Sequence, residues 1–144
     1  MKSNDRPQQI ASPRNRRSLD GRMKMIEMDE KVGFSTQMEV EVGPVILINK
    51  FNVNPEEADQ FLRTWAHDAS IMKRQPGFIS AQLHRGIAGS GVFINYAVWE
   101  SIEYFKRAFN NPEFLSNIAE YPAGTISSPH LIKKVAVPGI CVGE

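Results

Sequence analysis

Hydrophobic and polar positions follow two different periods between residues 44 and 140. Alternating or continuous apolar positions with β-branched residues are typical of strands. The run Val45–Val53 predicts a first strand, and residues 78–85 and 92–99 predict two more, joined as a hairpin by the glycine-rich segment 86–91. A last strand is expected over residues 130–137.

Apolar positions at three- and four-residue steps predict a helix between the first two strands. Asn54 and Pro55 supply a cap and a first helical proline, and Pro76-Gly77 ends the helix near residue 74. Trp65 belongs to its apolar stripe, whereas His67 and Asp68 are expected on a solvated side. Shorter helices are expected from 101 to about 109 and from 111 to about 120.

The resulting order βαββαβ predicts an α+β protein with a ferredoxin-like, antiparallel sheet. Helices would cover one face of that sheet only. The strands carry few charges on either face, as strands buried on both sides do. The second face is therefore expected to meet a second copy, which gives a homodimer built as a dimeric α/β-barrel.

Charge divides the chain into an extension and a domain. Residues 1–24 hold seven Lys/Arg and two acids, residues 25–43 one Lys and five acids, and residues 44–144 nine of each. We expect a 1–43 N-terminal extension, largely disordered over residues 1–22 because little there can be buried, and a 44–144 domain. The near-neutral domain disfavours nucleic acid as a partner, and no apolar run reaches the roughly 18 residues of a membrane span.

The single cysteine, Cys141, excludes an internal disulfide and favours a cytoplasmic protein. Three widely spaced histidines predict no metal site. We therefore expect no metal cofactor.

A candidate site follows from the predicted hairpin. If residue numbers across the turn sum to 179, one face of the sheet gathers the polar side chains Ser80, Gln82, His84, Asn95 and Trp99, with Phe78 and Phe93 at its ends. Ala97 leaves space there for a flat ligand.

The chemistry of this face lies in neutral donors. The Asn95 amide and Trp99 indole N–H can stabilise an enolate or phenolate, and His84 can take a proton. Ser80, Gln82 and Phe93 are the candidate substrate-binding residues. The alternative is that Asn95 and His84 are structural residues of their strands.

The segment Asn95–Ser101, Asn-Tyr-Ala-Val-Trp-Glu-Ser, together with Phe78–His84, resembles the antibiotic biosynthesis monooxygenase family, especially its small anthrone and quinol monooxygenases. The similarity covers roughly residues 45–140. It implies a ferredoxin-like homodimer that inserts one atom of O2 into an electron-rich aromatic substrate without metal, flavin or haem. Asn95 and Trp99 would polarise the substrate oxygen, with His84 in the same pocket.

Two positions depart from that family pattern. Phe105 stands where the polyketide enzymes place a tyrosine, and their arginine falls near Ile118. A non-catalytic dimeric barrel that binds an aromatic metabolite is therefore an alternative. Asn49 matches an asparagine of a haem-degrading branch, but residues 101–120 lack the Trp and His that this branch needs, so this alternative is weaker. From these family matches, Phe105 and Asn49 join Ser80, Gln82 and Phe93 as candidate substrate-binding residues.

Overall fold

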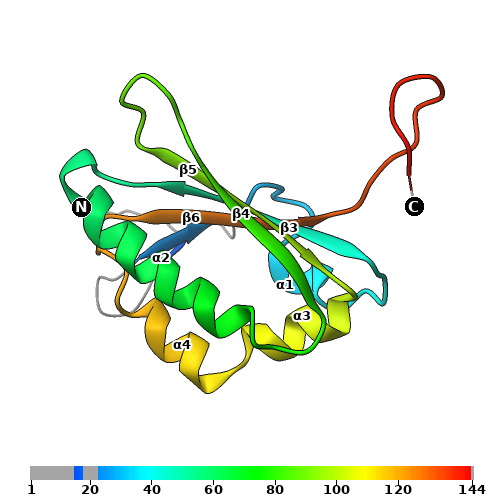
Figure 1. Cartoon of the computed structure of the whole chain (residues 1–144), viewed down its shortest axis with the longest axis horizontal. Helices are drawn as coiled ribbons and strands as arrows, with labels where there is room; N and C mark the ends of the chain where they lie inside the picture. Colours follow the sequence, from blue (N-terminus) through cyan, green and yellow to red (C-terminus); the bar gives the residue numbers. More distant parts are fainter. Residues whose placement is uncertain (1–14, 18–22, 144) are drawn as a thin grey trace, which may run out of the picture.

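The computed structural model describes residues 15–17 and 23–143, which form one twisted sheet with helices against one face (Figure 1). Its elements in chain order are β1 (Asn15–Arg17), β2 (Lys24–Ile26), α1 (Phe34–Gln37), β3 (Val45–Asn52), the 3-10 turn η1 (Pro55–Glu57), α2 (Ala58–Met72), β4 (Phe78–Arg85), β5 (Val92–Trp99), α3 (Ile102–Phe109), α4 (Pro112–Ile118) and β6 (Ile126–Ile132). No helix in these residues is long and apolar enough to cross a membrane.

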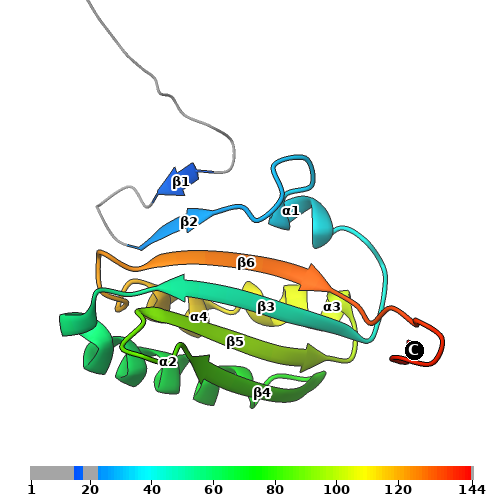
Figure 2. The same ribbon diagram turned by 90° about the horizontal axis from the view of Figure 1, so that it is seen from above.

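The βαββαβ order and the ferredoxin-like α+β fold are confirmed. The sheet has the strand order β1-β2-β6-β3-β5-β4, and β3, β4, β5 and β6 pair antiparallel. Helices α2, α3 and α4 lie behind this sheet when it is viewed from above (Figure 2). The opposite face carries no helix among the described elements.

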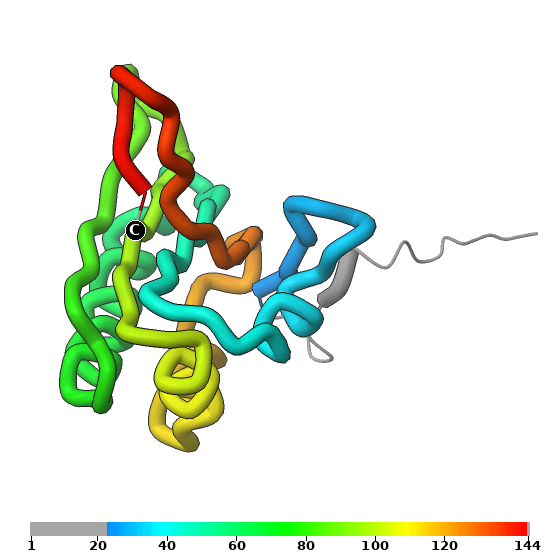
Figure 3. Tube along the Cα trace, turned by 90° about the vertical axis from the view of Figure 1, so that its right-hand side faces the viewer, coloured from blue at the N-terminus to red at the C-terminus, as the bar shows by residue number. Residues whose placement is uncertain are grey.

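The N-terminal segment adds two strands to the sheet edge. β2 pairs parallel with β6, and β1 pairs antiparallel with β2. Asn15–Arg17 form β1, and the rest of residues 1–22, the range expected to be largely disordered, lies outside the described residues. The predicted boundary at residue 44 thus separates segments that share one sheet. In Figure 3 the blue trace of β2 runs beside the orange trace of β6.

The last strand begins four residues earlier than expected, at Ile126, and ends at Ile132. Its Ser-Ser-Pro sequence lacks the apolar pattern of a strand. The Asn49 side chain instead accepts hydrogen bonds from these serines. The Asn49 Oδ1 accepts hydrogen bonds from Ser127 Oγ at 3.0 Å and from the Ser128 N–H at 3.1 Å. Residues 133–143 then leave the sheet as an arm, closed into a turn by a bridge between Val137 and Cys141.

The β4–β5 hairpin has a different register from the one predicted. The Gly86 N–H donates to the Val92 carbonyl at 2.8 Å, which leaves the five residues 87–91 in the loop. Ala88 and Gly89 turn the chain there with φ of 60° and 77°. An odd loop pairs Leu83 with Asn95, one residue away from the predicted partner His84. Because strand side chains alternate, this slip moves the β4 side chains from Ser80 to Arg85 to the other face. A register shift between Phe78 and Ser80 keeps Phe78 on the predicted face, where it lines the cavity.

The core lies between the sheet and the helices in two clusters. One is centred on Trp99 and Phe105 and includes Phe34 of α1, and the other is centred on Phe61, Phe93 and Tyr121. Phe61 is fully buried, and its ring centre lies 4.8 Å from that of Phe93 with the two rings tilted by 37°. The two clusters leave a space between them, and this space forms the candidate site.

Candidate active site

A cavity of about 310 Å³ lies between the helix-facing side of the sheet and α2, α3 and α4. Its wall is mainly apolar and aromatic, as small-molecule sites are. The polar or titratable residues that line it are Lys24, Asn49, Asp68, Asn95, Trp99, Tyr121 and Ser127. These side chains come from three separate parts of the fold: the sheet, α2 and the segment after α4.

Two polar atoms of β5 are buried in this wall without a partner. Asn95 and Trp99 are four residues apart in one strand, so they share a face, with Ala97 between them. The Asn95 Oδ1 and the Trp99 Nε1 have no hydrogen-bond partner in the part of the chain that the structure describes. A buried polar atom without a partner costs about 1–3 kcal/mol, which is usually explained by function. Both atoms are therefore available to a bound molecule.

Asn49 adds a third polar group directly opposite Asn95 in the β3–β5 ladder. The Ser128 backbone N–H can only donate, so the Asn49 atom that receives it must be the amide oxygen. The Asn49 Nδ2 consequently remains a donor. Asn49 also lines the cavity, on the same face as Asn95.

Three of the sequence-predicted residues lie elsewhere. Ser80, Gln82 and His84 are exposed on the opposite face of the sheet, because the five-residue loop shifts the register. The Gln82 amide donates to the backbone of the next residue, and the His84 ring contacts the Ile94 carbonyl at 3.2 Å. Their predicted placement beside Asn95 and Trp99 is wrong.

The two predicted phenylalanines separate as well. Phe105 lines the cavity and packs edge-on against Trp99, with ring centres 5.7 Å apart. Phe93 faces the helices but is buried in the second core cluster and is not among the residues that line the cavity. Ile118 also lines the cavity, so the two positions that depart from the family pattern both contribute apolar wall.

Sequence reasoning missed a carboxylate. Asp68 was expected in solvent, but it lines the cavity, and its Oδ2 accepts a 2.7 Å hydrogen bond from the Tyr121 hydroxyl. The signal was its spacing, since Asp68 lies three residues after Trp65 and four before Met72, both of which line the cavity. Burial raises the pKa of Asp68 from 3.8 to about 6, although the Tyr121 hydrogen bond and the charge of His67 act to lower it.

The pKa of the Tyr121 hydroxyl is raised well above 10.0. Burial is the main cause, followed by the charge of Asp68 and the hydrogen bond to it. The hydroxyl therefore keeps its proton and donates a hydrogen bond to the Asp68 carboxylate.

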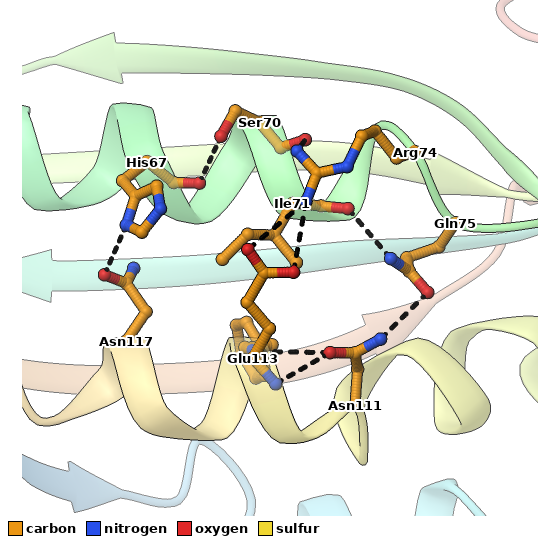
Figure 4. A network of polar contacts seen from close by, with 9 residues as sticks. His67, Ser70, Ile71, Arg74, Gln75, Asn111, Glu113 and Asn117 are labelled. Atoms are coloured by element: carbon orange, nitrogen blue, oxygen red, sulfur yellow. Dashed lines mark hydrogen bonds and ion pairs between the residues drawn. The ribbon is translucent and has the colours of Figure 1, made fainter.

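Polar contacts clamp α2 onto α4 beside the cavity (Figure 4). The His67 Nδ1 contacts the Asn117 Oδ1 at 2.9 Å, and the Asn111 amide donates to Gln75 Oε1 at 3.3 Å. Arg74 and Glu113 form an exposed ion pair at 3.1 Å, which contributes little by itself. Together these contacts fix the position of α2, and with it that of Asp68.

The N-terminal segment supplies the remaining wall. Met23, Lys24 and Met25, in and next to β2, line the cavity together with Phe34 of α1. Across residues 23–143, no group of three or more His, Cys, Asp or Glu side chains is placed to hold a metal ion.

Residues 44–119 match the family model described as antibiotic biosynthesis monooxygenase. Among curated proteins, the chain is 34% identical over 76 residues to a deoxynogalonate monooxygenase of Streptomyces nogalater, covering 53% of this chain and 64% of that protein. It is 32% identical over 69 residues to a mycobilin-producing heme oxygenase of Mycobacterium tuberculosis, covering 48% of this chain and 66% of that protein. The chain thus spans just under two thirds of the length of these relatives.

Among solved structures, a cofactor-independent oxygenase from Streptomyces nogalater superposes with a TM-score of 0.59 and 28% identity. The superposition covers 68% of this chain and 99% of that one. Since the family match begins at residue 44, the cavity wall formed by β2 and α1 lies outside the matched part.

Proposed function

Because the chain belongs to the antibiotic biosynthesis monooxygenase family, we propose that it inserts one oxygen atom from O2 into a small electron-rich aromatic compound, such as an anthrone, quinol or phenol, without metal, flavin or haem. The observation that carries this proposal is the pair of partnerless buried atoms, Asn95 Oδ1 and Trp99 Nε1, in the wall of an apolar cavity.

The proposed role of these groups is to hold and polarise the substrate oxygen. A flat aromatic compound fits against Ala97, between the sheet and α2. Its oxygen would accept hydrogen bonds from the Trp99 Nε1–H and the Asn49 Nδ2, and a substrate hydroxyl would donate to the Asn95 Oδ1. Fixed donors in a site with little water stabilise the negative charge that develops when the substrate loses a proton.

The deprotonated substrate supplies the electrons for the reaction. With anthrone, its carbanion gives electrons to O2 and a carbon–oxygen bond forms. Cleavage of the O–O bond leaves one oxygen atom as the new carbonyl of the quinone, and the other departs as water. One O2 is consumed for each anthrone, and no external reductant is needed.

Haem degradation is supported less well. Haem iron is usually held by His, Cys, Met or Tyr. The methionines Met23, Met25 and Met72 line the cavity, but Met holds haem iron together with His, and no histidine or cysteine lines the cavity within the described residues. The Tyr121 hydroxyl is bonded to Asp68. A binding protein without activity is the second candidate, supported by the apolar Phe105 and Ile118 in the cavity wall.

We infer that the protein acts as a homodimer joined through the helix-free face of the sheet. Ile79 and Tyr96 on this face are 51% and 37% exposed. The C-terminal arm adds the exposed apolar side chains Val135, Ile140 and Val142. A second copy would cover such a surface economically, because exposed apolar patches of this kind mark interfaces.

Oxygen uptake tests the proposed function. Protein dialysed against a chelator is mixed with anthrone, and O2 consumption and quinone formation are followed with ¹⁸O2 as the source. We expect uptake above the buffer rate, one quinone for each O2, and one labelled oxygen in the quinone. Binding of anthrone without uptake would favour the binding protein, and uptake only after haem is added would favour the haem-degrading alternative.

A further inference from the structure

The proposed reaction needs a group that takes the proton, and the sheet provides none. His84, the residue expected in this role, lies on the far face. Among the described residues that line the cavity, Asp68 is the one with a carboxylate side chain. It approaches from α2, opposite the strands that carry Asn95 and Trp99.

The Asp68 carboxylate is held in one orientation. Tyr121 is 4% exposed, and its hydroxyl donates to the Asp68 Oδ2 at 2.7 Å. This bond occupies one carboxylate oxygen, while the described hydrogen bonds include none to Oδ1. The helix that carries Asp68 is fixed against α4 through His67 and Asn117. An oriented acceptor with one oxygen available, placed at the cavity wall, has the geometry of a general base.

We propose that Asp68 is the base that accepts the substrate proton, and that Tyr121 positions its carboxylate. This inference rests on the proposed function. In the step, the substrate C–H or O–H bond breaks and an O–H bond forms at the Asp68 Oδ1. The electron pair stays on the substrate, delocalised onto the oxygen that Trp99 and Asn49 contact. No oxidant takes part until O2 reacts with the resulting anion.

The surroundings of Asp68 fit this role. Its pKa of about 6 keeps it ionised at neutral pH and makes it a stronger base than an ordinary aspartate. The titratable groups around it are His67 on its own helix, Tyr121 after α4, and Lys24 of β2 in the same cavity wall. Strands β3, β4, β5 and β6 and helices α3 and α4 contribute no titratable side chain to that wall.

Proton exchange without oxygen tests the proposal separately from the oxygenation. Anthrone is incubated anaerobically in D2O with the full chain, and loss of its CH2 proton signal is followed by NMR. After the buffer rate is subtracted, we expect Asp68→Asn to lower the rate of proton exchange by about a hundredfold or more. Aerobic turnover should fall by a similar factor. Binding of anthraquinone, which has no such proton to lose, should change less than threefold. Asp68→Glu should recover part of the rate.

Tyr121→Phe provides a readout that a merely structural contact would not move. The Tyr121 hydrogen bond lowers the pKa of Asp68, so its loss should shift the acid limb of the exchange rate from about pH 6 to higher pH. Asp59→Asn, which removes an exposed carboxylate in the first turn of the same helix, is the matched control and should keep the wild-type profile.

Each outcome discriminates. Exchange within threefold of wild type in Asp68→Asn overturns the role of Asp68 and leaves the proposed oxygenase function intact. Exchange by wild type that is lost in Asp68→Asn, without O2 uptake by either protein, supports the role of Asp68 and overturns the oxygenation. Absence of both in wild type, with anthrone bound, overturns both.

Discussion

Asn49 lies directly opposite Asn95 in the β3–β5 ladder, and the two amides serve different purposes. The Asn49 oxygen is bonded to Ser127 and Ser128 and ties β6 to β3. The Asn95 oxygen is buried without a partner. Asn49 therefore combines structural hydrogen bonds at its oxygen with a donor at the cavity. The oxygen of Asn95 makes no hydrogen bond within the described residues.

This difference predicts opposite effects of two substitutions. Asn95→Ala removes a polar atom that has no partner, so the melting temperature should stay equal or rise while turnover falls by about a hundredfold. Asn49→Ala leaves the Ser128 N–H without its acceptor, so stability should fall by about 1–3 kcal/mol in addition to any loss of turnover. Oxygen uptake per folded molecule and urea unfolding measure the two quantities. If Asn95→Ala melts early with normal turnover, Asn95 is a packing residue.

Replacement of Asp68 should stabilise the protein above pH 6. The folded-state pKa of about 6 exceeds the unfolded value of 3.8, so the folded protein binds the proton more tightly. Stability from this group is present below pH 3.8 and is lost as pH rises to about 6. Because Asp68 keeps partial contact with solvent, we expect Asp68→Asn to gain about 1–2 kcal/mol over wild type at pH 8 and much less at pH 4.

Urea unfolding at the two pH values checks this gain. Asp59→Asn, an exposed position in the first turn of the same helix, is the control and should show no such pH-dependent gain. An equal effect of Asp68→Asn at pH 4 and pH 8 would contradict the raised pKa.

The homodimer can be tested at Tyr96, which faces away from the helices. Light scattering of wild type should give about twice the 16.2 kDa chain mass at micromolar concentration. Tyr96→Glu places a charge on the proposed interface and should yield monomers. Leu115→Glu, at a 45% exposed position of α4, should leave the mass unchanged. A monomeric wild type would refute the interface.

Met25 of β2 should limit the size of the substrate, because it lines the cavity from outside the family-matched segment. Met25→Ala enlarges the cavity, so kcat/KM for an alkyl-substituted anthrone relative to anthrone should rise by about tenfold. Met28→Ala, at a 45% exposed position that does not line the cavity, should not alter this ratio. An unchanged ratio in Met25→Ala would place substrate selection elsewhere.

The periodic segments were predictable from the sequence because their information is local. The first strand, the long helix and the hairpin each follow from neighbouring residues, and the Asn95–Trp99 pair follows from alternation within one strand. β6 was misplaced because Ser127 and Ser128 depend on a side chain of another strand, Asn49. Asp68 was misassigned because a carboxylate is ordinarily solvated, and its partner Tyr121 is 53 residues away.

The register error has a different origin, the parity of one loop. Five residues, 87–91, join β4 to β5. Deletion of a single codon there, for example that of Ala88, would favour an even loop and turn the outer side chains of β4, with their hydroxyl, amide and imidazole, toward the ligand. β4 therefore carries two sets of side chains, an apolar set that faces the cavity and a polar set that faces away from it. A single in-frame deletion in the loop would thus change which polar groups face the cavity, without any change to the residues of the strand itself.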